Sequence, residues 1–163
     1  MLIWAQRLAD RKGHGTLGFV IAGILIVILD QASKWLAVQH LQLGQSVALP
    51  GHLFYLTLVY NPGAAFGIFA HATPFLIALT LGVLAAVWVY RDEIACQSTL
   101  LKLGLTLSLA GAVGNLIDRI RLGYVIDFID VRIWPVFNVA DCGIVGGVIL
   151  LFWLLIAEGK GKT

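Results

Sequence analysis

Apolar residues form long stretches in this chain, and most polar residues gather between them. Four apolar stretches lie at about 17–36, 74–90, 100–117 and 139–157. Each is close to the roughly 17–25 residues that a helix needs to cross about 30 Å of hydrocarbon. The pattern therefore predicts four membrane-spanning helices. The first is expected to be a retained anchor, because its apolar stretch continues into DQASKW without the small-residue cleavage site of a signal peptide.

The two longer connections, 37–73 and 118–138, have a different pattern. The first contains HLFYLTLVY, which is rich in β-branched and aromatic residues and predicts a short strand on the membrane surface, followed by a turn at Asn61-Pro62-Gly63. The second contains YVIDFIDV, which also favours an extended segment. We expect an all-α integral membrane protein, a single domain over 1–163, with four transmembrane helices, a small extracytoplasmic β-rich cradle and a surface loop.

Composition supports the bilayer as the solvent. The chain is 60% hydrophobic and only 12% charged, with a mean hydropathy of +0.92, whereas a soluble domain is about 25% charged. A net charge of +2 without a basic run gives no reason to expect a nucleic-acid partner. Cys96 and Cys142 have no metal-ligand spacing, so they give no reason to expect a metal site.

The distribution of Lys and Arg predicts the orientation. The first connection, 37–73, has neither residue type. Basic residues lie before the first span, around the connection between spans two and three, and at the end of the chain: Arg7, Arg11, Lys12, Arg91, Lys102, Lys160 and Lys162. The positive-inside rule then places both termini in the cytoplasm and the two longer connections outside.

Five polar motifs fall on the predicted outer face. Asp30 and Lys34, in DQASK, are spaced i and i+4, so we expect an ion pair with the Lys34 ammonium extending to the interface. The alternative is that this pair orients a substrate or a lipid headgroup. Asn61, in NPGAAFGIF, either belongs to a structural turn or contacts an extended ligand.

The third motif, GNLIDR, closes the third span. Asn115 and Asp118 share a helical face, and Arg119 follows directly. We expect an Asp118–Arg119 interaction that satisfies the helix end. A neighbouring guanidinium lowers the pKa of a carboxyl and keeps it ionised, which favours a structural anchor over a general acid.

The last two motifs each contain an acid in an unusual place. Asp127, in VIDF, has apolar neighbours in the sequence, and burial among them would raise its pKa. Asp141, in FNVAD, lies in the predicted first turn of the fourth span, where free N–H groups stabilise an anion. Asn138 already suits the cap position, so Asp141 is predicted to be available for another role, although simple capping remains an alternative. Two carboxylates in contrasting environments can share a proton and act as an acid and base pair.

Three function classes fit these residues. An intramembrane peptidase would use the two acids as a catalytic pair. A proton- or ion-coupled transporter would use them as a relay, although transport sites usually lie near the midplane between repeats, and no repeat is visible here. A structural membrane subunit is the third class.

Taken in order, DQASK, NPGAAFGIF, GNLIDR, VIDF and FNVAD closely resemble the motifs of the lipoprotein signal peptidase family, signal peptidase II, over about residues 20–158. The resemblance implies a bacterial inner-membrane aspartic endopeptidase that cuts diacylglyceryl-modified prolipoproteins just before the lipid-modified cysteine. It also implies a site near the extracytoplasmic surface, contact with membrane lipid and no cofactor; we expect a monomer.

The resemblance assigns roles residue by residue. It implies that Asp127 and Asp141 form the catalytic dyad. Asp118 is the other candidate acid, and we expect it to support the dyad. The remaining matches are expected to bind substrate or to support the site: Asp30, Lys34, Asn61, Asn115, Arg119 and Asn138.

Overall fold

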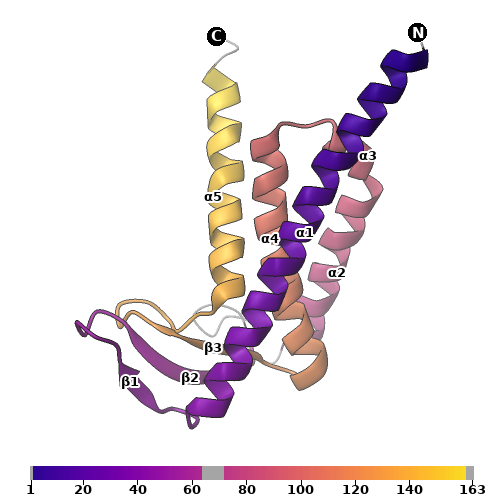
Figure 1. Ribbon diagram of the computed structural model, residues 1–163. Coiled ribbons are helices and arrows are strands. Elements are labelled where there is room, and N and C mark those ends of the chain that lie inside the picture. Colours follow the sequence, from indigo (N-terminus) through magenta and orange to yellow (C-terminus); the bar gives the residue numbers. More distant parts are fainter. Residues whose placement is uncertain (1, 64–71, 161–163) are drawn as a thin grey trace.

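The computed structural model describes residues 2–63 and 72–160 (Figure 1). Its helices are α1 (Leu2–His40), α2 (Thr73–Val89), α3 (Arg91–Ala95), α4 (Thr99–Leu122) and α5 (Val139–Lys160), and its strands are β1 (Ser46–Ala48), β2 (Tyr55–Asn61) and β3 (Val125–Asp130). The rest of the NPGAAFGIF motif after Gly63 lies outside the described residues. So do the side chains that carry much of the orientation argument, Arg7, Arg11, Lys12, Lys160 and Lys162.

Three of the described helices are long and apolar enough to cross a membrane: α1 from Leu17 to His40, all of α4, and α5 from Val139 to Ala157. The helix predicted at 74–90 is present as α2, with 17 residues. At about 1.5 Å per residue it is about 25 Å long, shorter than the other three. The chain is therefore a membrane protein whose described part contains three clear candidate spans and one shorter apolar helix.

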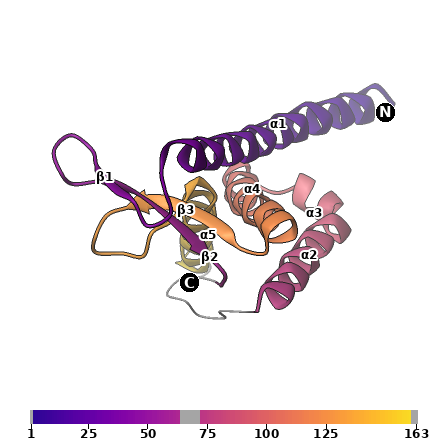
Figure 2. The ribbon, with the colours of Figure 1, turned by 90° about the horizontal axis from the view of Figure 1, so that it is seen from below.

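Helix α4 is the centre of the bundle, with α1, α2 and α5 packed around it (Figure 2). Glycines bring α5 close to α4. A Cβ atom on Gly111 would overlap the carbonyl oxygen of Ala140, and one on Gly147 would overlap the hydroxyl of Ser108. Small residues at helix interfaces allow this close packing in membranes. The contact at Gly111 fixes the first turn of α5 against α4.

The end of α4 leads directly into β3. Gly123 has a φ of 83°, and its N–H donates to the carbonyl of Arg119, so it ends the helix in the left-handed conformation that glycine adopts easily. The chain reverses there and β3 begins at Val125. This turn brings Asp127 back toward the last turns of α4.

The described strands form a small antiparallel sheet in the order β1-β2-β3 at one end of the bundle (Figure 1). Val59 pairs with Asp127, and the register shifts between Leu56 and Val59. The sheet packs on the end of α1 through buried Ala37, Leu58 and Phe128. The prediction of a small β-rich element beside a helical membrane domain is confirmed.

Candidate active site

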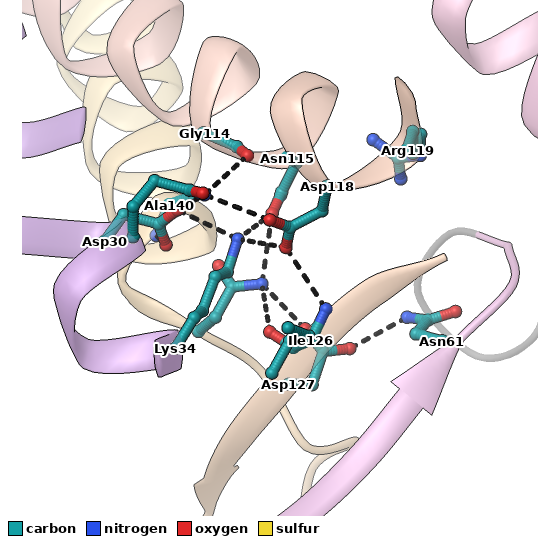
Figure 3. Close-up of polar contacts among 12 residues, drawn as sticks. Asp30, Lys34, Asn61, Gly114, Asn115, Asp118, Arg119, Ile126, Asp127 and Ala140 are labelled. Carbon is teal, nitrogen blue, oxygen red and sulfur yellow. Dashed lines mark hydrogen bonds and ion pairs between the residues drawn. The ribbon is translucent and has the colours of Figure 1, made fainter. Parts of the chain in front are cut away.

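Polar side chains from α1, β2, α4 and β3 converge where the sheet meets the helices (Figure 3). Asp141, in the first turn of α5, joins them through a hydrogen bond from Asn115. Six of them are at most 4% exposed: Asp30, Lys34, Asn115, Asp118, Asp127 and Asn138. Asn61, Arg119 and Asp141 are half-buried. We call these nine residues the polar cluster. Buried polar groups are costly unless they are hydrogen-bonded, so the partners of each one define the site.

Lys34 is the cation at the centre of the polar cluster. Its Nζ atom lies 2.9 Å from Asp30 Oδ2, 2.8 Å from Asp118 Oδ2 and 2.9 Å from Asn115 Oδ1. An ammonium has three N–H donors, and each has an acceptor here. The predicted pair with Asp30 is confirmed, but the predicted extension to the interface is wrong, because Lys34 is only 1% exposed.

Asp118 binds Lys34 and not Arg119. Its Oδ1 accepts from Gln31 Nε2 at 3.0 Å, and its Oδ2 also accepts from the backbone N–H of Ile126 at 3.2 Å. The Arg119 guanidinium donates instead to the carbonyl of Gly63 at 3.1 Å. The predicted Asp118–Arg119 interaction is therefore corrected, because consecutive residues of a helix point in different directions. Asp118 joins α1, α4 and β3.

Asp30 links α1 to the start of α5. Its Oδ1 accepts from the backbone N–H of Ala140 at 2.9 Å, one of the N–H groups that the first helical turn leaves without a partner inside the helix. Gly114 allows this approach, since a Cβ atom there would lie 2.6 Å from Asp30 Oδ2. Asp30 is therefore part of the support of the helix that carries Asp141.

Asp127 is held by two side-chain amides. Its Oδ2 accepts from Asn61 Nδ2 at 2.9 Å and its Oδ1 from Asn138 Nδ2 at 2.7 Å. Its environment is thus more polar than its sequence neighbours indicate. Burial nevertheless raises the pKa of Asp127 to about 7, with the nearby Asp141 charge adding to the rise and the two amides and Lys34 opposing it. The expected upward shift is confirmed.

Asp141 and Asn138 form a reciprocal cap on α5. Asn138 Oδ1 accepts from the backbone N–H of Asp141 at 2.9 Å, and Asp141 Oδ2 accepts from the backbone N–H of Asn138 at 3.2 Å. This is the geometry of a capping box. The prediction that Asn138 takes the cap position is confirmed. Asp141 also takes part in capping, because one of its oxygens accepts the backbone hydrogen bond from Asn138. The other, Oδ1, accepts from Asn115 Nδ2 at 2.8 Å.

Asn138 connects the two acids. Its side-chain amide bonds Asp127, while its backbone N–H bonds Asp141. Asn115 in turn connects Asp141 to Lys34, because its Oδ1 accepts from the Lys34 ammonium and also from Asn138 Nδ2, the latter at 3.1 Å. Every predicted site residue except Arg119 thus belongs to one connected hydrogen-bond network. Arg119 stands beside it and orders the backbone at Gly63.

One member of this network was not assigned a role from the sequence. Gln31 Nε2 lies 3.1 Å from Asp30 Oδ2, 3.0 Å from Asp118 Oδ1 and 3.2 Å from the carbonyl of Gly114. It bridges the two acids that share Lys34. The available signal was its position: an amide between Asp30 and Lys34 at the end of an apolar span needs partners inside the protein.

The fold and the site together define a membrane protein with a buried, carboxylate-rich site at one end of its helical bundle. A family model described as signal peptidase (SPase) II matches residues 21–157. The chain belongs to the signal peptidase II family. It is accordingly a protease of lipoprotein processing, as the family and its relatives indicate.

Individual relatives are similar in sequence to this chain over almost their whole length. The chain is 45% identical to the lipoprotein signal peptidase of Moorella thermoacetica over 143 residues, which cover 87% of this chain and 95% of the relative. It is 45% identical to that of Pelotomaculum thermopropionicum over 146 residues, or 89% and 95% of the two chains. A bacterial membrane enzyme solved by the in meso method at 2.3 Å resolution is similar in structure, with a TM-score of 0.84, 31% identity and coverage of 90% and 92%.

Proposed function

We propose that this chain is an aspartic endopeptidase that removes the signal peptide from diacylglyceryl-modified prolipoproteins by cutting just before the lipid-modified cysteine. The observation that carries the proposal is the arrangement around Asn138, which hydrogen-bonds both Asp127 and Asp141. An acid and base pair requires two carboxyl groups held near each other in environments that favour different protonation states. Here one residue holds both groups, and the pKa of Asp127 is about 7.

In the proposed reaction Asp127 is the protonated partner. It donates a hydrogen bond to the scissile carbonyl oxygen while Asp141, as the carboxylate, takes a proton from a water molecule. The water oxygen then bonds the carbonyl carbon and gives a tetrahedral intermediate. Collapse of this intermediate breaks the C–N bond as the proton on Asp141 passes to the leaving nitrogen, and the new carboxyl group and amine separate.

The rest of the polar cluster supports this pair. Asn115 and Asn138 fix the Asp141 carboxylate through both of its oxygens. Asn61 does the same for one oxygen of Asp127. Lys34, with Asp30 and Asp118, joins α1, α4 and α5 beneath the pair. Arg119 orders the backbone next to Asn61 by binding the carbonyl of Gly63.

The proposed setting is the bacterial inner membrane, with α2 as the fourth span and both termini in the cytoplasm. The polar cluster then lies near the extracytoplasmic surface, and the protein acts as a monomer. The acyl chains of a lipidated substrate partition into the bilayer with about 0.8 kcal/mol for each buried CH₂. They hold the modified cysteine near the interface, at the depth where the acid pair lies.

The test is a cleavage assay in detergent with a lipidated prolipoprotein peptide and its unlipidated counterpart. The wild type should cut only the lipidated peptide efficiently. Asp127→Asn and Asp141→Asn should each lower kcat by at least about 10³-fold, because each removes one half of the acid and base pair. Asp130→Asn is the matched control: it changes another buried acid of β3, bonded to Thr57 and outside the polar cluster.

Two results would contradict the proposal. Near-normal cleavage by Asp127→Asn or Asp141→Asn would contradict the mechanism in which the two acids act as a pair. An equal loss in Asp130→Asn would show that the assay reports damage to the sheet. The transporter class is not favoured by the family, and it would regain support only if the wild type moved protons across liposomes and cut no peptide.

A further inference from the structure

A second feature of the molecule lies apart from the polar cluster. A cavity of about 640 Å³ extends between α1, α2, α3 and α4 from the end of the bundle that carries α3. Helices α1 and α2 both pack on α4 and have few contacts with each other, and side chains of both helices line this cavity. Its volume is in the usual range for small-molecule sites, roughly 300–1,000 Å³. We call this space the α1–α2 groove.

The walls of the α1–α2 groove are almost entirely apolar, with Ile24 and Val27 from α1 and Leu105 and Leu109 from α4. On α4 the lining runs from Lys102 to Val113. At about 1.5 Å per residue this is about 16 Å, close to half of the roughly 30 Å hydrocarbon thickness. The groove therefore has the length of one leaflet.

Two cations lie at one end of this apolar groove, Arg91 of α3 and Lys102 of α4, and no acid is among its described lining residues. Lys102 Nζ has one long hydrogen bond, at 3.5 Å to the carbonyl of Ala95, and lies 5.6 Å from the centre of the Phe19 ring. An ammonium has three donors, so Lys102 has donor capacity for an anionic oxygen.

Arg91 is also available. It donates to the carbonyl of Trp88 at 2.9 Å through one nitrogen, and Asp92 lies 3.7 Å from another. The Asp92 side chain is 84% exposed, so this surface pair is weak. A guanidinium has five N–H donors and binds phosphate well. Both cations line the α1–α2 groove and have donors that could bind a phosphate group there.

We infer that the α1–α2 groove binds one anionic phospholipid, with an acyl chain along α1 and α4 and its phosphate between Arg91 and Lys102. Basic pockets between membrane helices bind anionic headgroups in this way. The charge argues against the signal helix of a substrate as the occupant. Signal peptides begin with a basic segment, which in the proposed topology would meet these same two cations.

The test compares phosphatidylglycerol with phosphatidylcholine of identical acyl chains, titrated into the detergent-purified protein and followed by native mass spectrometry. The wild type should prefer phosphatidylglycerol. Arg91→Gln and Lys102→Gln should each reduce that preference about fivefold, in line with roughly 1 kcal/mol for each cation near a headgroup. Arg121→Gln is the matched control, an exposed cation at the other end of α4 that does not line the groove.

Three results would overturn the inference: equal binding of both lipids by the wild type, an unchanged preference in a double variant that combines Arg91→Gln and Lys102→Gln, or displacement of bound lipid by a synthetic signal helix. Photolabelling of the wild type provides a readout that needs no variant. Phosphatidylglycerol with a diazirine in its acyl chain should label peptides covering 19–28 and 102–113. Labelling confined to α5 would contradict the assigned position.

Discussion

At the scale of single residues, Lys34 is expected to contribute strongly to the stability of the site. It is buried and satisfies acceptors on Asp30, Asp118 and Asn115. Lys34→Met would leave two buried carboxylates near each other without their cation. Breaking a buried pair in this way typically costs about 3–5 kcal/mol, so we expect a markedly lower unfolding temperature in detergent, together with loss of cleavage.

A second substitution separates charge from packing at this position. Adding Asp118→Asn to Lys34→Met removes one of the two uncompensated charges and should restore part of the lost thermal stability. Arg121→Met, which removes an exposed cation of α4, should change the unfolding temperature little. If Lys34→Met alone were as stable as the wild type, the buried pairs would not contribute as described.

The pKa of Asp127 predicts a pH dependence of cleavage. Burial raises this pKa to about 7, and the proposed mechanism requires the protonated form. The rate constant kcat/KM should therefore fall as pH rises through about 7. A profile that keeps rising above pH 8 would contradict the role of Asp127 as the acid.

The same shift predicts a dependence of stability on pH. In the unfolded protein this carboxyl has a pKa of about 3.9. Below about pH 4 it is protonated in both states and does not lower the free energy of unfolding, whereas between about pH 4 and 7 this free energy falls, because only the unfolded state ionises freely. Asp127→Asn has no such charge, so the difference in unfolding free energy between variant and wild type should shift in favour of the variant over that window, by up to about 4 kcal/mol. Thermal unfolding at pH 5 and pH 8 measures this; a constant difference would contradict it.

The sequence indicated the individual site residues better than their partners. Asp127 and Asp141 could be identified from the sequence because an acid beside a membrane span is energetically costly and therefore indicates a function. The partner of Asp118 could not be identified, since Lys34 is far away in sequence and reaches Asp118 only after α1 packs on α4. The capping box of Asn138 and Asp141 was visible as an Asn three residues before an Asp, and only its reciprocal bond was missed.

At the scale of elements, the contact between α4 and α5 positions the site. Gly111→Ala would push a Cβ atom into the carbonyl of Ala140, and overpacking of this kind costs typically about 1–3 kcal/mol. We expect a shift of the first turn of α5 and a loss of cleavage of at least tenfold. Gly146→Ala is the matched control on α5, where a Cβ atom meets nothing within 4 Å.

The elements themselves were predicted with uneven success. The apolar stretches predicted the start of α4 and of α5 closely, because length and hydropathy are local properties. Helix α4 continues to Leu122, beyond the predicted end near residue 117, so Asp118 and Arg119 lie in the helix and not in the predicted loop. Helix α1 continues to His40, beyond the predicted end near residue 36, since its last turns pack on the sheet through Ala37. The strand order β1-β2-β3 was not predicted, because pairing between β2 and β3 joins segments that are separated by α2 and α4.

At the scale of the whole molecule, the proposed orientation can be tested with single cysteines in a background without Cys96 and Cys142. Leu53→Cys, in the hairpin between β1 and β2 and 75% exposed, should react with a membrane-impermeant maleimide added to intact cells. Asp92→Cys, in α3, should react only after the membrane is opened. The reverse pattern would place the polar cluster on the cytoplasmic side.

The polar cluster contains four carboxylates, Asp30, Asp118, Asp127 and Asp141, and two cations, Lys34 and Arg119. If every acid were ionised, the negative charges would exceed the positive ones by two. The site is therefore short of cations, and a proton is the smallest one available to it. A substrate that displaces water from this place should draw a proton in as it binds, so that recognition and preparation for chemistry become the same event.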